Sequence, residues 1–256
     1  LDVEICVVGA APVGGTLACR LASAGIATAL VDRAALPPME HPDFDGRAYA
    51  IAAGSRRVMQ ESGLWDRLPY PPGPITGIRV SDGKPGRPAS PLHLHFDAAE
   101  IGDSPFGWMV EARSLRMALN AHMADLPKLH LFAPAIARVQ RQAEGAIIQV
   151  QGGPHITARL VVAAEGRRSA LREQAGIPVT HLPYHQVGIV CCIAHEVPHE
   201  GVALEHFLPG GPFALLPMAA TEAAPNISAI VWTERTATAE RIMQLDAPRF
   251  TAHLAR

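Results

Sequence analysis

A strand, a glycine-rich turn and a helix at the start of the chain constrain its fold more than any other feature. The apolar run VEICVVGA is typical of a buried parallel strand, and its glycine is Gly9. The next segment spaces small and apolar residues at helical intervals and closes at Gly25. A second apolar run, ATALVDR, reaches Asp32, which lies 18 residues beyond Gly14. This order predicts a β-α-β unit with an acid at the tip of its second strand.

The turn departs at one position from the dinucleotide-binding pattern G-x-G-x-x-G, because Ala11 stands where the middle glycine belongs. Gly9 allows the tight turn, and Gly14 allows close packing of the helix on the sheet. The helix N-terminus would face a pyrophosphate, and Asp32 would accept hydrogen bonds from a ribose. Ala11 adds one methyl group, so we expect a looser site that still binds. The pattern alone does not separate NAD from FAD, and a unit that uses its small residues only for packing is the alternative.

Composition and charge exclude several function classes. The formal net charge is −2 and the hydrophobic fraction is 48 %, which argues against nucleic-acid binding and for a sizeable core. No CxxC pair occurs among the four cysteines, which favours buried thiols in a reducing compartment. His93 and His95 form an H-x-H pair without further ligands at a metal-site spacing, so we interpret them as the polar face of a strand and expect no metal. The apolar runs are shorter than the roughly 20 residues of a membrane span, and strand-like residues begin at once, so we expect a soluble or peripheral protein without a signal peptide.

The remaining pattern predicts an α/β chain of two interleaved domains. A helix is predicted within residues 45–68, ending at Gly63, and a hairpin follows within 75–98. Three strand-like segments then form a meander that leads into AEGRRSALREQAGI, a strand, sharp turn and helix. We expect residues 1–74 and 105–178 to build a Rossmann-like nucleotide domain. Residues 75–104 and 179–256 would build a mainly antiparallel substrate domain, incomplete at its C-terminal end.

Three ordered motifs, together with the N-terminal turn, give the chain a resemblance to a known family. They are DGRAYAIAAGSRRVMQESGLW, AEGRRSALREQAGI and FLPGGPFALLPM. In this order they resemble the FAD-dependent aromatic hydroxylases related to p-hydroxybenzoate hydroxylase, and more narrowly their ubiquinone-biosynthesis (Ubi/Coq monooxygenase) branch. The resemblance covers almost all 256 residues and implies FAD as the cofactor.

The resemblance also implies roles for individual residues, by their place in these motifs. The turn would contact the pyrophosphate, Asp32 the adenosine ribose, and Arg47 would lie near the flavin. The implied cofactor-binding residues are Gly9, Ala11, Pro12, Gly14, Asp32, Arg33, Arg47, Arg113, Glu165 and Gly166. The implied substrate-binding residues are Phe213, Leu215 and Pro217. Glu165 replaces the aspartate of the family motif, and Ala112 stands where relatives often carry Arg or Asn, so Arg113 is the neighbouring candidate. No residue is assigned as acid, base or nucleophile.

The implied activity is hydroxylation of the aromatic ring of a polyprenylated phenol in ubiquinone biosynthesis, with NAD(P)H and O₂ as co-substrates. A hydroxylase of a small soluble phenol and a non-catalytic, flavoprotein-like fragment are the alternatives. A Gly-Asp segment that completes the FAD site in the family is not found here, so we expect this chain to fold, to hold FAD weakly or not at all, and to be inactive by itself. The resemblance further implies a cytoplasmic protein and allows a peripheral association with the inner membrane, with a biosynthetic complex or with a second copy of the chain.

Overall fold

The computed structural model describes residues 1–36, 46–87, 90–222 and 224–255, and contacts divide the chain into two compact units. Unit 1 comprises Leu1–Pro42, Gly54–Pro69 and Arg113–His181. Unit 2 comprises Asp43–Ala53, Tyr70–Ala112 and Leu182–Arg256. The two units are therefore interleaved in sequence. Residues 46–53, 70–74 and 105–112, which the sequence pattern assigns to the nucleotide domain, group with unit 2, and residues 179–181 group with unit 1.

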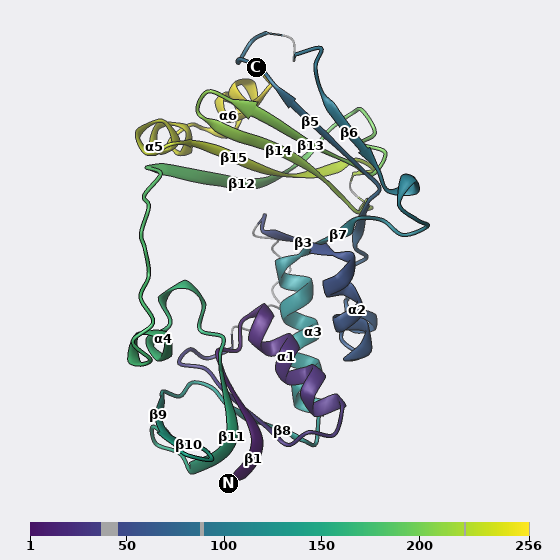
Figure 1. Ribbon diagram of the computed structural model, residues 1–256. Helices are drawn as coiled ribbons and strands as arrows, with labels where there is room; N and C mark the ends of the chain where they lie inside the picture. The colour runs from purple at the N-terminus through teal and green to yellow at the C-terminus, as the bar shows by residue number, and fades with distance from the viewer. Residues whose placement is uncertain (37–45, 88–89, 223, 256) are drawn as a thin grey trace. The chain divides into compact units, whose positions relative to one another are not determined.

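Unit 1 is built on a six-stranded sheet in the order β8-β2-β1-β11-β10-β9 (Figure 1). The first four strands in this order run parallel, and β10 and β9 add to β11 as the antiparallel meander that the sequence predicts. A buried apolar cluster, which includes Cys6, Val31 and Ile148, fills one face of the sheet. The strands are β1 (Asp2–Val8), β2 (Thr28–Val31), β8 (Leu129–Phe132), β9 (Ala137–Gln142), β10 (Gly145–Val150) and β11 (His155–Ala163).

Helices α1 and α3 carry the apolar stripes that bury the parallel part of this sheet. Ala18 and Cys19 of α1 and Leu115 and Leu119 of α3 are all at most 2 % exposed. The helices are α1 (Pro12–Ser23), α2 (Ala53–Glu61), α3 (Ala112–Asp125) and α4 (Ala170–Gln174), with 3₁₀ turns at Trp65–Arg67 and Gly166–Arg168. No helix in the described ranges is both long and apolar enough to cross a membrane.

The helix of about three turns predicted to end at Gly63 is confirmed as α2, and strand β3 (Ala48–Ala52), which the sequence pattern does not reveal, precedes it. Tyr49 pairs with Val110 and Ile51 with Trp108 of strand β7 (Gly107–Glu111), so sheet pairing overrides the helix propensity of this alanine-rich segment. Helix α2 begins only after this strand. Strands β3, β7 and β4 (Gly73–Ile75) together form a small three-stranded sheet within unit 2.

Unit 2 contains a second six-stranded sheet, in the order β12-β15-β14-β13-β5-β6 (Figure 1). All neighbours are antiparallel except β13 and β5, which pair in parallel and join the early hairpin to the late strands. The strands are β5 (Gly77–Asp82), β6 (Leu94–Asp97), β12 (Gln186–Ala194), β13 (Val202–Leu208), β14 (Gly211–Met218) and β15 (Ile227–Arg235). Helices α5 (Thr236–Met243) and α6 (Ala247–Leu254) and a 3₁₀ turn at Ala98–Glu100 complete the unit. The α/β class with a mainly antiparallel second sheet is confirmed.

The two faces of this second sheet bury different clusters. On one face, Trp232 and Ile230 pack with Ile242 of α5 and Phe250 of α6. On the other face, Met218, Ala203 and Ala229 pack with Ile75 and Met109 of the small sheet. Alternate residues of each strand therefore belong to separate cores. We call the face packed by α5 and α6 the helix face of the sheet, and the opposite face the open face.

Candidate functional site

The topology of unit 1 places a candidate site at the carboxyl end of β1. Strand β1 lies between β2 and β11 in the sheet. The strand order reverses at β1, which makes it the topological switch point. Ligands of open α/β sheets bind at such switch points, beyond the carboxyl ends of the strands. A cavity of about 270 Å³ lies there. Its lining residues come from β1, β2 and the segments after β8 and β11: Val8, Gly9, Val31, Asp32, Arg33, Ala135, Ile136, Ala137, Glu165, Arg168 and Ala170.

Two glycines let the backbone close tightly around this point. Gly9 has a φ of +109°, a conformation that favours glycine, and a Cβ on it would overlap the carbonyl of Ala164. A Cβ on Gly14 would overlap the carbonyl oxygen of Gly9 and lie 2.9 Å from the Cβ of Ala164. The outer glycines of the fingerprint therefore allow the β1 turn, the start of α1 and the end of β11 to meet. Side chains at either position would overlap these neighbouring atoms and force the turn and the helix apart.

The N-terminus of α1 is suited to an anion. Ala11 is the N-cap residue, with extended backbone and an exposed methyl group, and no side chain caps the helix. Pro12 follows at the first helical position, where its missing N–H costs nothing. The amide groups of the first turn and the positive end of the helix dipole remain for a ligand. Ala11 carries its methyl group outward, so the structure fits a pyrophosphate here despite the missing glycine.

Asp32 follows β2, as predicted, but its carboxylate is already engaged with the backbone. Oδ2 accepts a hydrogen bond from Ala10 N at 2.6 Å, and Oδ1 accepts one from Ala34 N at 2.8 Å. The acid thus holds the fingerprint turn in place, a role that the sequence pattern does not reveal. Each carboxylate oxygen can accept a further hydrogen bond, so contact with a ribose is compatible with this geometry and stays a prediction.

Three arginines surround the turn. Arg33 is exposed and lines the cavity with Arg168, so two cations flank the acids Asp32 and Glu165. Arg116, on α3, donates from Nη1 to the carbonyl of Ala10 at 2.9 Å and ties that helix to the turn. Arg116 was missed by sequence reasoning, although a cation on the half-buried side of an apolar helix is a usable signal.

Glu165 has a structural role in the turn after β11. Its Oε2 accepts hydrogen bonds from Ser169 Oγ at 2.6 Å and from Leu171 N at 3.0 Å. Ser169 in turn caps α4 by accepting from Arg172 N. Gly166 has a φ of +77°, a Cβ on it would meet nothing within 4 Å, and it lines a separate cavity between the meander and α4. Both residues stand at the switch point, and their contact with a cofactor stays a prediction.

Arg47 and Arg113, the other two predicted cofactor residues, belong to different units. Arg47 precedes β3 in unit 2, where its carbonyl accepts the amide hydrogen of Ala112. Arg113 lies in the first turn of α3, in unit 1. The residue that contacts the fingerprint turn is Arg116, three positions further along this helix.

The predicted substrate residues lie on one face of β14. Phe213 and Leu215 pack in the cluster beneath α5 and α6, and Phe213 meets Trp232 edge to face with ring centroids 5.9 Å apart. Pro217 alternates with them on the same face. Their contact with a substrate stays a prediction, but the intervening Ala214 and Leu216 point to the open face instead.

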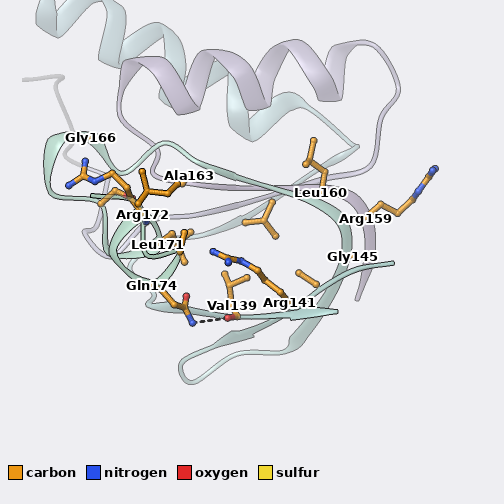
Figure 2. Close-up of a pocket in the computed structure, with 15 residues that line it drawn as sticks. Val139, Arg141, Gly145, Arg159, Leu160, Ala163, Gly166, Leu171, Arg172 and Gln174 are labelled. Carbon is orange, nitrogen blue, oxygen red and sulfur yellow. Dashed lines mark hydrogen bonds between the residues drawn. The ribbon is translucent and has the colours of Figure 1, made fainter. Parts of the chain in front are cut away.

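A second cavity, of about 590 Å³, lies between the meander and α4 (Figure 2). Arg141 extends into it beside Val139 and Leu171, while Gln174 donates a hydrogen bond to Val139 O at 3.0 Å. The cavity follows the part of β11 beyond Ala158, where β10 no longer pairs with it. It has no glycine-rich turn and no long helix N-terminus, since α4 has only 5 residues. The cavity at Gly9 is therefore the candidate nucleotide site.

Comparison with known proteins identifies the nucleotide cofactor of the family. A family model described as "FAD binding domain" matches residues 2–246. The chain belongs to this family. FAD is thus confirmed as the cofactor of the family, over NAD, which the turn alone had left open. The cradle at Gly9 and Gly14 and the uncapped α1 fit the diphosphate of FAD.

Curated members of the FAD binding domain family include ubiquinone hydroxylases. The chain is 42 % identical to ubiquinone hydroxylase UbiL of Rhodospirillum rubrum, over 99 % of its own length and 57 % of that protein. It is 29 % identical to 3-demethoxyubiquinol 3-hydroxylase of Escherichia coli, over 99 % of its length and 63 % of that protein. The chain therefore spans about three fifths of the length of these relatives. The predicted resemblance to the ubiquinone branch is confirmed.

Solved structures share the fold of this chain. PqsL of Pseudomonas aeruginosa, described as a probable FAD-dependent monooxygenase, superposes with a TM-score of 0.71 at 17 % identity, over 95 % of this chain and 63 % of that one. The p-nitrophenol 4-monooxygenase PnpA of Pseudomonas putida gives a TM-score of 0.69 at 15 % identity, over 99 % and 61 %. At such identities the likeness supports the fold alone.

Proposed function

We propose that this chain contributes the FAD site and the substrate sheet of an aromatic hydroxylase that consumes NAD(P)H and O₂ and acts on a polyprenylated phenol in ubiquinone biosynthesis. The observation that carries this proposal is the 42 % identity to a ubiquinone hydroxylase over 99 % of the chain. It agrees with a fingerprint turn whose glycines, acid and helix N-terminus fit the diphosphate end of FAD.

The residues of unit 1 would bind and orient the cofactor. The first turn of α1 would donate amide hydrogen bonds to the pyrophosphate, and Asp32 would both hold the turn and accept from the adenosine ribose. Arg33 and Arg168 would balance the negative charge of the diphosphate. When bound, FAD supplies the redox chemistry by which NAD(P)H and O₂ are used. No side chain of this chain is proposed as an acid or base.

The residues of unit 2 would provide an apolar surface for the ring and exclude water from it. A peripheral association with the inner membrane would suit a substrate with a lipid tail. This association, and a role for a biosynthetic complex or a second copy of the chain, remain predictions.

Two alternative functions differ in their observable products. A hydroxylase of a small soluble phenol would turn over phenols without a prenyl tail. A non-catalytic binding protein would hold FAD or a partner but would transfer no oxygen.

The proposal is tested in the whole enzyme that carries this chain, incubated with FAD, NADPH and ortho-farnesylphenol under isotopically heavy dioxygen. We expect one heavy oxygen atom in the ring of the product, with the second recovered in water and one NADPH oxidised for each ring. Parallel reactions with unsubstituted phenol separate the lipid-tailed from the soluble substrate. Bound FAD with no labelled product from either phenol would contradict the hydroxylase and favour the binding protein.

A further inference from the structure

One row of side chains crosses all of the second sheet on its open face. Cross-strand partners point to the same face, so the register gives the members of the row directly. Leu94 pairs with Val80, Val80 with Glu205, Glu205 with Ala214, Ala214 with Val231, and Val231 with Val190. We call these six residues the Glu205 row. Every member except Glu205 is apolar.

The Glu205 row is exposed at its two ends, whereas Ala214 near its centre is buried. The adjacent row on the same face includes Ala203, Leu216 and Ala229, and it is packed against the small sheet. In the Glu205 row, by contrast, Leu94 is 62 % exposed and Val190 is 50 % exposed. The helices α5 and α6 pack on the opposite face.

An apolar hollow adjoins the carboxylate. A cavity of about 360 Å³ lies where β5 and β6 meet the end of β13, and its apolar lining includes Val80, Leu94 and Phe207. Val80 is the direct neighbour of Glu205, and Phe207 lies two positions further along β13 on the same face. The lining also includes Ser81, Asp82 and His93, so the surface joins the Glu205 carboxylate to a mainly apolar wall large enough for an aliphatic chain.

A half-buried carboxyl group among apolar side chains is stabilised by a hydrogen-bond donor. Burial raises the pKa of Glu205 above its ordinary value, because its apolar surroundings disfavour the charged form. Among the described residues no ion pair involves this carboxylate. A fully exposed glutamate is solvated by water. A glutamate between Val80 and Ala214 is stabilised by a ligand that donates a hydrogen bond and also covers the apolar neighbours.

We propose that Glu205 accepts a hydrogen bond from the hydroxyl group of a phenol whose ring lies on the Glu205 row and whose apolar tail enters the hollow at Val80, Leu94 and Phe207. This proposal rests on the proposed function, which supplies a phenol with an isoprenoid tail as the ligand. It goes further by naming the acceptor and the wall, none of whose residues is among the implied substrate-binding residues Phe213, Leu215 and Pro217. Glu205 is a substrate-positioning residue in this account.

The test uses a matched pair of probes, ortho-farnesylphenol and its methyl ether, which differ only in the hydroxyl donor. Binding of each to the purified protein is measured by isothermal titration calorimetry. We expect the phenol to bind about ten- to a hundredfold more tightly than the ether, the range of a hydrogen bond to a charged group. Glu205→Leu should abolish that preference by weakening the phenol and leaving the ether unchanged or tighter.

The control variant is Glu234→Leu, which removes a carboxylate from β15 on the helix face of the same sheet. It should keep the preference for the phenol, and circular dichroism of both variants confirms that the sheet is intact. The inference is overturned if the wild type binds neither probe or binds both equally, or if Glu205→Leu keeps the preference.

Two further readouts separate this inference from its rivals. If sedimentation shows a dimer that Val190→Asp dissociates, the Glu205 row is an interface between two copies and the proposal fails. If FAD binds and ring hydroxylation proceeds while Glu205→Leu changes neither probe, the proposed function stands and only this inference is lost. If hydroxylation is absent but the phenol preference depends on Glu205, the binding site stands and the proposed reaction fails.

Discussion

Replacing Gly14 by alanine tests whether the start of α1 must approach the turn after β1. The new Cβ would overlap the carbonyl oxygen of Gly9 and lie 2.9 Å from the Cβ of Ala164. Neither neighbour is a flexible side chain, because one is backbone and the other is a methyl group fixed at the end of β11. The helix would therefore have to move away from the sheet.

The expected magnitude is the difference of two effects. Alanine gains about 1 kcal/mol of helix propensity over glycine. Overpacking against rigid atoms costs about 1–3 kcal/mol, and the fixed backbone of Gly9 places this site at the upper end of that range. We expect a net loss of about 1–2 kcal/mol, which lowers the thermal midpoint by roughly 3–8 °C. Binding of FAD should weaken as well, because the first turn of α1 is displaced from the pyrophosphate.

The assay compares thermal unfolding by circular dichroism with FAD titration, and Gly54→Ala is the matched control. Gly54 lies in the first turn of α2, is exposed, and a Cβ there would meet only Arg57 Nη2, at 3.8 Å. This control should raise stability by up to about 1 kcal/mol and leave FAD binding unchanged. The reasoning is refuted if Gly14→Ala is as stable as Gly54→Ala and binds FAD like the wild type.

Other substitutions probe the remaining parts of the site and the core. Asp32→Ala should weaken FAD by about 1–3 kcal/mol and also destabilise the turn, since the amides of residues 10 and 34 lose their acceptor; an unchanged dissociation constant removes Asp32 from the cofactor site. Ala11→Gly should leave FAD affinity unchanged or slightly higher, and a large loss in the titration would show that the turn does not approach the pyrophosphate. Ser169→Ala should cost about 1 kcal/mol in urea unfolding through loss of the α4 cap, and full stability would argue against that cap. Burial raises the pKa of Cys6 and Cys19 from 9.0 to about 12, so the unfolded chain ionises first and the free energy of unfolding should fall as pH rises through this range. Cys19→Ala should make that fall shallower, and an unchanged slope contradicts the assignment.

The β-α-β unit could be predicted because each of its parts has a local signal. Buried parallel strands are continuous apolar runs, and glycine marks the turns that no other residue can make. The meander and the late strands were predictable for the same reason. Strand β3 was not, since Ala48–Ala52 has no strand signal of its own and becomes a strand only by pairing with β7. Sequence spacing alone does not report such non-local pairings.

The site was predictable in position and less so in the roles of its residues. Asp32 and Glu165 were expected to face a cofactor, yet each holds backbone amides of its own turn. Arg116, one helical turn beyond the predicted Arg113, contacts the fingerprint turn, and the cofactor contact of Arg113 stays a prediction. The open face of the second sheet could not be foreseen, because register decides which of two alternating sets of residues is covered. Glu205 lies on that open face, so its place beside the apolar row could not be predicted from the sequence.

The central claim is that FAD binds with its diphosphate at the N-terminus of α1 and its adenosine ribose beside Asp32. A crystal structure of the protein soaked with millimolar FAD tests it most directly. We predict density for the pyrophosphate within hydrogen-bond distance of the amides that follow Pro12, and for the ribose at the carboxylate of Asp32. Density in the cavity beside Arg141 and Leu171, with none at Gly9, would contradict the account.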